Sequence, residues 1–268
     1  MLRAGIIGYG TLGRSISELI VAGQAGDVVL QSLLVRSPLG PLDNTPDQCT
    51  VTTNEEEFFD QDLDIIIEAA GHQALQLYGE KALSSGSNLV ILSVGALANN
   101  NFYETIKDTA AKNKKQIIIP SAAIAGLDRI AAGVLGEIDE ITLITRKHPK
   151  SWYGTIAEEK VDLETITEPF CIFDGNARNA AKLFPENVNV SAALSLAGIG
   201  FEETKVQVYV DPTIQMNTHT IVAKGFFGQM EISIQNKPFK QNPKSSPIVA
   251  MSVAKVLQNL TTPLVIGL

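Results

Sequence analysis

The fold is decided by residues 2–13, which read Leu-Arg-Ala-Gly-Ile-Ile-Gly-Tyr-Gly-Thr-Leu-Gly. The first six residues of this stretch predict a short buried strand, and apolar residues recur at helical spacing from Leu12 to Ile20. Between them, Gly8, Gly10 and Gly13 follow the spacing G-x-G-x-x-G. The first glycine allows a tight turn, and the third lets the helix pack closely on the strand. The stretch therefore predicts a strand–turn–helix unit of an α/β fold.

This glycine turn, residues 8–13, also predicts a ligand. Its second glycine lets the backbone approach a pyrophosphate, and the helix that begins near Thr11 and Leu12 directs its amino end at the phosphates. The alternative is a plain turn without a ligand. We favour dinucleotide binding, because the motif lies between a strand and a helix, as this mode of binding requires.

The end of the next predicted strand, Val28 to Val35, selects the dinucleotide. Enzymes that use NAD usually place an acidic residue there, where it binds the ribose 2′-hydroxyl. This chain has Arg36 and Ser37 instead, and both side chains can bind a 2′-phosphate. The alternative is that Arg36 stacks on the adenine or lies in solvent. We expect NADP, or the use of both NADP and NAD.

Short apolar runs continue to alternate with polar segments up to Pro120. The predicted strands are residues 65–67, 89–92 and 117–119, and residues 101–115 predict a helix. Continuous β-branched runs are typical of parallel strands covered on both faces. We therefore expect a doubly wound parallel sheet, the Rossmann fold, in a dinucleotide-binding domain over residues 1–120.

The pattern changes after Pro120. Apolar and polar residues alternate in several strands, which indicates a sheet with one less-buried face. The predicted strands are 141–145, 205–210, 218–223 and 229–234, and the predicted helices are 126–136, 176–183, 188–197 and 246–260. We expect a second, α+β domain over residues 121–242 and a C-terminal helix within 243–268 that packs back on the first domain.

Composition limits the partners. The chain has 268 residues, of which 21 are Lys or Arg and 29 are Asp or Glu, so its formal net charge is −8. An acidic chain is a poor partner for nucleic acid, and no apolar run is long enough to span a membrane. Cys49 and Cys171 have no neighbours at metal-ligand spacing, so we expect unpaired thiols and no metal site. No signal-peptide pattern precedes the glycine turn, which predicts a cytoplasmic protein.

Seven segments carry a family resemblance. They occur, in order, at 93–97 (Ser-Val-Gly-Ala-Leu), 120–128 (Pro-Ser-Ala-Ala-Ile-Ala-Gly-Leu-Asp), 145–147 (Thr-Arg-Lys), 184–190 (Phe-Pro-Glu-Asn-Val-Asn-Val), 211–212 (Asp-Pro), 217–219 (Asn-Thr-His) and 242–246 (Asn-Pro-Lys-Ser-Ser). Together they resemble the L-aspartate dehydrogenase family, whose NAD(P)-dependent members oxidise the amine of aspartate. The chain departs from the family pattern at Ala122 and Ala125, where glycines are common, and at His148, where a proline is usual. The family also often has an acid near position 36, which is missing here.

The resemblance implies roles for particular residues. His219 matches the family's catalytic histidine, and Ala123 and Asn189 match positions that contact the nicotinamide cofactor. The second domain is implied to have a mixed open-faced sheet, to hold the substrate and to mediate a homodimer. The implied reaction is oxidation of L-aspartate to iminosuccinate, which water converts to oxaloacetate and ammonia, and its reverse.

The residues themselves support acid/base chemistry at His219. Amine oxidation needs a group that accepts a proton, and histidine suits this role near neutral pH. Asn217 lies two residues earlier on a strand-like run, so both side chains face the same way. A structural histidine is the alternative on these residues alone. The pair argues against a second alternative, a catalytically silent NAD(P)-binding sensor.

Other candidates follow from position. Ala70 and His72 come just after a predicted strand, at the edge where doubly wound sheets bind ligands, and we assign Ala70 to the cofactor and no chemistry to His72. Ser121 and Asn217 are candidates to bind substrate carboxylates, with Lys147 as a candidate cation. Glu68 and Asp128 could be taken for general bases, although Asp128 at a helix start is read as structural. These assignments leave room for another amino-acid-derived dicarboxylate as substrate.

Overall fold

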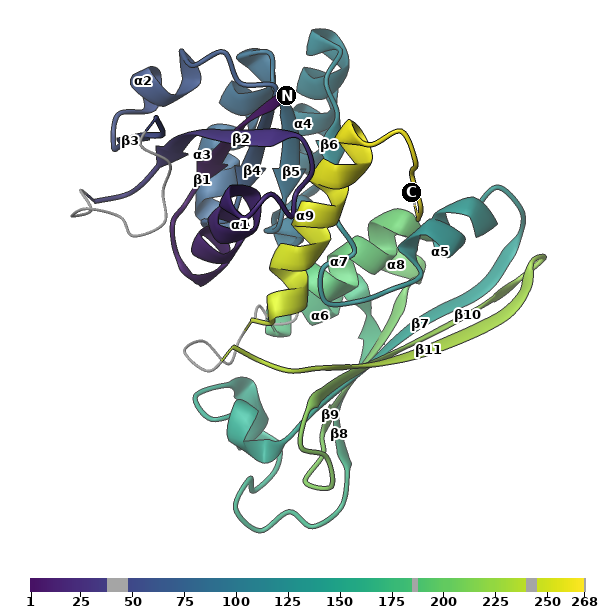
Figure 1. The fold of residues 1–268 in the computed structure, drawn as a ribbon. Coiled ribbons are helices and arrows are strands. Elements are labelled where there is room, and N and C mark those ends of the chain that lie inside the picture. Colours follow the sequence, from purple (N-terminus) through teal and green to yellow (C-terminus); the bar gives the residue numbers. More distant parts are fainter. Residues whose placement is uncertain (38–47, 185–187, 240–244, 268) are drawn as a thin grey trace. The chain divides into compact units, whose positions relative to one another are not determined.

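A computed structural model describes residues 1–37, 48–184, 188–239 and 245–267 of the chain. Two compact units make up the molecule: Met1–Ala122 with Pro247–Leu268, called unit 1 here, and Ala123–Ser246, called unit 2. Figure 1 labels their helices and strands. Residues 185–187 and 242–244, which belong to segments of the family resemblance, lie outside the described ranges.

Unit 1 is built on a parallel sheet of six strands in the order β3-β2-β1-β4-β5-β6. The strands are β1 (Leu2–Ile7), β2 (Val28–Leu34), β3 (Thr50–Thr52), β4 (Ile65–Glu68), β5 (Asn88–Ile91) and β6 (Ile117–Ile118). This is the strand order of doubly wound dinucleotide-binding sheets. The predicted Rossmann fold is confirmed.

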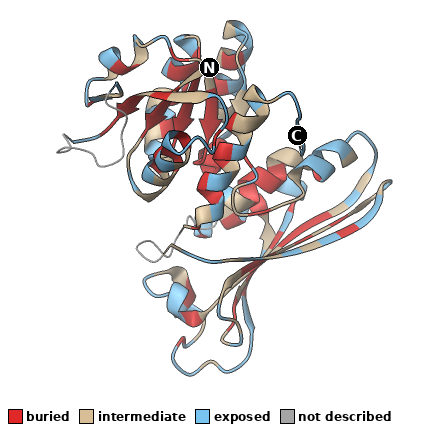
Figure 2. Ribbon diagram, in the orientation of Figure 1, coloured by how far each residue is buried: buried red, intermediate tan, exposed pale blue. Residues whose placement is uncertain are grey.

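Helices cover both faces of this sheet because its parallel strands are joined by right-handed crossovers that run in opposite directions from β1. α1 (Thr11–Val21) packs with α9 (Pro247–Thr261), and α3 (His72–Ser84) packs with α4 (Asn100–Asn113) (Figure 1). The central strand β4 is buried along its whole length (Figure 2). Its continuous isoleucine run is therefore explained by apolar layers on both sides.

The C-terminal helix α9 is part of unit 1. The side chains of Val253 and Leu257 on this helix are fully buried. The Thr261 hydroxyl accepts a hydrogen bond from the Asp27 amide at 3.2 Å, and the Gln258 amide donates to the Gln24 carbonyl at 2.7 Å. The C-terminal helix α9 therefore packs beside the N-terminal helix α1 in one helical layer of unit 1.

Unit 2 contains a mixed sheet of five strands in the order β11-β10-β7-β9-β8. The strands are β7 (Ile138–Lys147), β8 (Phe170–Asn176), β9 (Lys205–Val210), β10 (Asn217–Gly225) and β11 (Gly228–Asn236). β7 and β9 are parallel, and the other pairs are antiparallel. Burial alternates along β9, where Val206, Val208 and Val210 are buried and the residues between them are not. The expected sheet with one less-buried face is confirmed.

Short helices accompany this sheet. They are α5 (Leu127–Gly133), α6 (Ala177–Leu183), α7 (Val188–Ala197) and α8 (Gly200–Glu203). Gly198, just after α7, lies so close to the sheet that a Cβ on it would come within 2.5 Å of Ile141 Cδ1 on β7. The helices therefore cover the face of the sheet to which Ile141 points. No helix in the described part of the chain is long and apolar enough to cross a membrane.

The sequence patterns missed some elements. No pattern predicted β3, α2 (Glu55–Phe59), α3, β8 or α8, and the predicted helix 126–136 is shorter, since α5 ends at Gly133. Three single turns were also missed: η1 (Val94–Ala98), η2 (Pro149–Ser151) and η3 (Ile156–Glu159). Apart from α3 and β8, these are elements of five residues or fewer, for which local periodicity is a weak signal.

Candidate active site

The glycine turn of unit 1 has the geometry that a bound pyrophosphate requires. Gly8 has φ +95°, a conformation that favours glycine, and its amide donates to the Leu34 carbonyl at 2.8 Å. A Cβ on Gly13 would lie 2.1 Å from the Gly8 carbonyl oxygen, whereas a Cβ on Gly10 would meet nothing within 4 Å. The turn therefore closes tightly on the strand and leaves its middle open, so it fits an approaching phosphate group.

Two neighbouring strand ends flank this turn. Ala70 lies directly against it, because a Cβ on Gly8 would be 2.7 Å from the Ala70 Cβ. Arg36 and Ser37 follow the end of β2 and are exposed. The structure thus brings Ala70 to the glycine turn, and it leaves Arg36 and Ser37 accessible at the neighbouring strand end.

His219 lies on the buried face of the unit 2 sheet, near the start of β10. It lies on β10 opposite Thr145 on β7, is 6% exposed, and its Nδ1 lies 3.1 Å from the Thr145 hydroxyl oxygen. Burial, reinforced by the positive charge of Lys147, lowers the pKa of His219 to about 4. The imidazole is therefore neutral near pH 7 and is able to accept a proton.

Lys147 shares this environment. It follows Thr145 by two residues on β7, so both side chains project from the same face of the strand. Its ammonium nitrogen lies 5.2 Å from the centre of the Trp152 ring, and the Trp152 indole donates to the Lys147 carbonyl at 3.2 Å. Lys147, the candidate cation, therefore projects from the same face of the sheet as His219. The sequence alone did not show which way its side chain points.

Asn217 lies at the start of β10, opposite Asn236 on β11. The Asn236 amide donates to the carbonyl of Ala123 at 2.7 Å. A predicted cofactor position, Ala123, and a predicted substrate position, Asn217, are therefore connected through Asn236. No sequence signal identified Asn236, because only the pairing of β10 with β11 places it there.

Arg146 faces the other side of β7 from the histidine. Its guanidinium stacks over the Tyr209 ring at 4.4 Å and bonds the Asp211 carboxylate at 3.2 Å. Burial alone would raise the pKa of Asp211, but hydrogen bonds from Thr213 and Arg146 hold that pKa below its ordinary value. This ion pair links the end of β7 to the end of β9, next to Thr145 and Lys147.

The remaining candidates have simple surroundings. Ser121 is exposed, and so is Asn189 in the first turn of α7. His72 is the first residue of α3, and His148 Nδ1 accepts the Lys150 amide at 3.2 Å at the start of η2. Asp128 lies in the first turn of α5, as its structural interpretation predicts.

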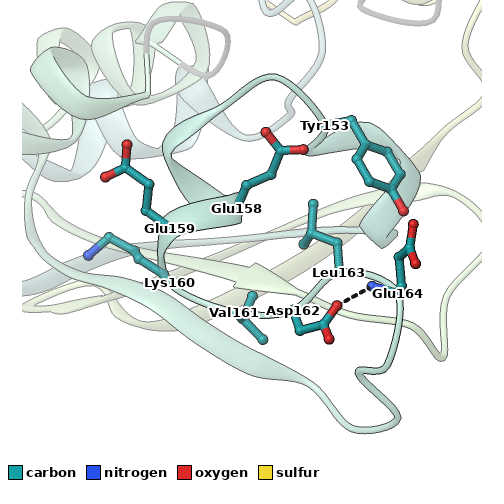
Figure 3. Close-up of a pocket in the computed structure, with 8 residues that line it drawn as sticks. All are labelled: Tyr153, Glu158, Glu159, Lys160, Val161, Asp162, Leu163 and Glu164. Carbon is teal, nitrogen blue, oxygen red and sulfur yellow. Dashed lines mark hydrogen bonds between the residues drawn. The ribbon is translucent and has the colours of Figure 1, made fainter.

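Unit 2 also has a cavity of about 540 Å³, drawn in Figure 3. It is lined by Tyr153 and residues 158–164, among which are four acidic side chains and the single cation Lys160. Asp162 accepts the Glu164 amide at 2.9 Å, shown as a dashed line in Figure 3. None of the predicted site residues lines it, and its acidic walls would repel a dicarboxylate.

Two family models together match most of the chain. The family model "Aspartate dehydrogenase, C-terminal" matches residues 128–260, and the model "Homoserine dehydrogenase, NAD binding domain" matches residues 8–120. L-aspartate dehydrogenase of Ralstonia pickettii (strain 12J) is 36% identical over 267 residues, 97% of each chain. L-aspartate dehydrogenase of Acinetobacter baumannii (strain AYE) is 44% identical over 196 residues, 73% of this chain and 74% of that one.

Solved structures share the fold. Aspartate dehydrogenase from Thermotoga maritima superposes with a TM-score of 0.77 at 23% identity and full coverage of both chains. Homoserine dehydrogenase from S. aureus gives 0.61 at 15% identity, with 97% of this chain and 77% of that one covered. With relatives matched over nearly the whole chain and a glycine turn shaped for a dinucleotide, the chain belongs to the L-aspartate dehydrogenase family of NAD(P)-dependent oxidoreductases that act on amino groups.

Proposed function

We propose that this protein is an NAD(P)-dependent L-aspartate dehydrogenase. In the proposed reaction the substrate ammonium loses one proton, and the Cα–H bond breaks with its electron pair to leave a carbon–nitrogen double bond. The product is iminosuccinate. Water then adds to the imine carbon, the carbon–nitrogen bond breaks, and oxaloacetate and ammonia are released. The same groups serve the reverse reaction.

The observation that carries the proposal is the neutral, buried imidazole of His219. Because Nδ1 lies against Thr145, Nε2 is the remaining atom that can accept the proton of the substrate ammonium. In that tautomer Nδ1 carries the hydrogen and donates to the Thr145 hydroxyl oxygen. A histidine with a pKa of about 4 is a weak base. A bound dicarboxylate would raise that pKa, since nearby negative charge favours the imidazolium.

The substrate carboxylates need donors, because a carboxylate removed from water without partners is costly. Lys147 supplies a positive charge near His219, and this charge contributes to the lowered pKa of the histidine. Asn217 shares the strand face of His219. We assign the substrate carboxylates to Lys147, Asn217 and Ser121.

The cofactor-binding residues we propose are Gly8, Gly10, Gly13, Thr11 and Leu12 for the pyrophosphate, together with Ala70, Ala123 and Asn189 elsewhere on the cofactor. When bound, the oxidised nicotinamide supplies the acceptor for the hydride that leaves Cα. The open space over Gly10 supports this assignment. The protein's own contribution is to orient the reactants and to move the proton.

We further propose NADP, or both NADP and NAD, as the cofactor. Arg36 and Ser37 stand where an NAD enzyme usually has an acid, and both are exposed to a ligand. Arg36→Ala should raise the Michaelis constant for NADP about tenfold or more and leave that for NAD within about twofold, since a charged hydrogen bond is lost only for the 2′-phosphate. An unchanged constant for NADP would remove this role.

Isotope transfer tests the proposed reaction. L-aspartate deuterated at Cα, incubated with the protein and NAD(P), should give deuterated NAD(P)H, detected by mass spectrometry of the nucleotide. L-malate and L-glutamate are matched controls, since one replaces the amine by a hydroxyl and the other adds a methylene. Unlabelled NAD(P)H, or faster turnover of either control, would contradict the proposal. NADPH binding without turnover of any of the three would favour a silent NAD(P)-binding sensor.

We also propose that the protein is located in the cytoplasm and forms a homodimer. The family resemblance supports the homodimer. A monomeric mass in solution by light scattering would contradict the oligomeric part.

A further inference from the structure

A buried carboxylate lies at the carboxyl ends of the parallel strands of unit 1, and the proposed reaction does not use it. Glu68 ends β4, and its side chain is fully buried. Its Oε1 accepts the amides of Ala70 at 2.7 Å and Gly71 at 2.8 Å and the Ser93 hydroxyl at 3.0 Å. Its Oε2 accepts the Ser93 amide at 3.1 Å. Four donors thus converge on a single side chain.

These donors belong to two different connections. Ala70 and Gly71 lie in the turn from β4 into α3, whereas Ser93 lies in the turn from β5 into η1. β4 and β5 are adjacent parallel strands, so both turns leave the same edge of the sheet. The carboxylate therefore fastens two neighbouring turns to each other and to the end of β4.

The first of these turns packs on the glycine turn. A Cβ on Gly8 would lie 2.7 Å from the Ala70 Cβ, 2.9 Å from the Ala70 Cα and 3.0 Å from the Ala69 carbonyl oxygen. The Ala69 amide also donates to the Ile7 carbonyl at 2.9 Å, one residue before Gly8. Because these contacts are so close, a shift of the turn at Ala70 would change the shape of the dinucleotide site.

The four hydrogen bonds to Glu68 also argue against a role as a general base. A general base needs a lone pair that reaches the substrate, and this side chain is enclosed with four donors on its two oxygens. An apolar side chain in its place would leave three backbone amides without this acceptor, which is costly inside a protein. The arrangement suits a carboxylate that holds backbone in place.

We propose that Glu68 is a positioning residue for the dinucleotide: it fixes the turns after β4 and β5 so that Ala70 and the glycine turn keep the shape that binds NAD(P). The proposal deepens the cofactor-binding half of the proposed function. It does not depend on which substrate is oxidised.

Direct binding of the reduced cofactor tests it. Glu68→Gln keeps the shape of the side chain but turns an amino group towards at least one of the backbone amides, so donor faces donor. The dissociation constant for NADPH, measured by nicotinamide fluorescence without substrate, should rise about tenfold or more. At saturating cofactor, turnover should stay within about threefold, because the proton-accepting group is elsewhere.

Ser87→Ala is the matched control. The Ser87 hydroxyl is buried, and it donates to the Leu63 carbonyl at 2.8 Å at the start of β5, the opposite edge of the same sheet. This variant also loses a buried hydrogen bond of unit 1, but its NADPH dissociation constant should stay within about twofold of the unmodified protein. Equal weakening by both variants would show that lost stability, not positioning, controls affinity.

Ser93→Ala keeps the test decisive if Glu68→Gln does not fold. It removes one of the four bonds and leaves the carboxylate, so the NADPH dissociation constant should rise about threefold or more. If the folded variants at Glu68 and Ser93 both bind NADPH as the unmodified protein does, the proposal is overturned. A protein that binds NADPH but does not oxidise aspartate would contradict the proposed substrate and still test this inference.

Discussion

At the scale of single residues, the proposed chemistry depends on the environment of one imidazole. His219 is enclosed on β10, and the charge of Lys147 adds to the effect of burial. Both disfavour the imidazolium, so the pKa falls from 6.5 to about 4. The free protein therefore holds a neutral histidine near a cation, and in the proposed reaction the negative charge of the substrate would offset that cation.

This depressed pKa predicts a dependence of stability on pH. Between pH 6.5 and pH 4 the unfolded chain binds a proton at His219 that the folded chain excludes, so stability is full above pH 6.5 and falls as the pH is lowered through this range. From pH 7 to pH 5 the free energy of unfolding should drop by about 2 kcal/mol through this residue alone. Urea unfolding followed by fluorescence of Trp152, the single tryptophan of the chain and buried in unit 2, measures it.

His219→Gln is the control for this prediction, since glutamine does not titrate. The difference in pH dependence between the two proteins isolates the histidine from the carboxylates that titrate in the same range. Identical slopes between pH 7 and pH 5 would mean that His219 is protonated as easily in the folded state as in the unfolded one.

Some site residues could be predicted from the sequence and others could not. The glycine turn has a fixed local spacing, and its strand and helix are contiguous in the chain, so its geometry follows from residues 2–20. Thr145, Glu68 and Asn236 act through partners 74, 25 and 113 residues away. Such pairings depend on strand order and register, which a local pattern does not contain.

At the scale of elements, the strands with long apolar runs were found, and two of the four edge strands of the described sheets, β3 and β8, were missed. β9 and α7 have the predicted bounds, 205–210 and 188–197. β3 has three residues, and β8 is an edge strand that ends in Asp-Gly-Asn, residues that disfavour strands. α3 was missed although Leu75, Gly79, Ala82 and Leu83 form its buried face. Gly79 is small there because a Cβ would lie 2.8 Å from Ile106 Cδ1 of α4.

The connection between β6 and α5 explains one departure from the family pattern. Ala122 has φ +51°, a left-handed conformation that glycine adopts without strain and alanine does not. Its amide donates to the Ser252 hydroxyl oxygen at 3.2 Å, within unit 1. The common glycine of the family at this position is thus accounted for by backbone conformation, and alanine here carries strain.

Ala122→Gly should therefore stabilise the protein by about 0.5–1 kcal/mol, because relief of the left-handed strain exceeds the extra entropy of glycine in the unfolded chain. Ala125 has no positive φ, so Ala125→Gly should instead destabilise by about 0.5–1 kcal/mol. Urea unfolding followed by circular dichroism measures both. A loss of stability in Ala122→Gly as large as that in Ala125→Gly would show that the strain is absent.

At the scale of the whole molecule, the proposed site residues are distributed over the two units. Unit 1 carries the glycine turn and Ala70, whereas unit 2 carries His219, Thr145 and Lys147. The sequence places the change of pattern at Pro120, and the two units meet in the chain between Ala122 and Ala123. The assignment of substrate binding and dimer formation to unit 2 stays a prediction.

The most direct test of the central claim is the aspartate-dependent rate of nicotinamide reduction, compared between the unmodified protein and His219→Ala. The account predicts turnover of L-aspartate by the unmodified protein, a rate lower by about 10²–10⁴-fold in the variant, and unchanged affinity for NADPH, because the histidine moves the proton and does not hold the dinucleotide. Near-equal rates in the two proteins, or no aspartate-dependent rate in either while NADPH still binds, would contradict it.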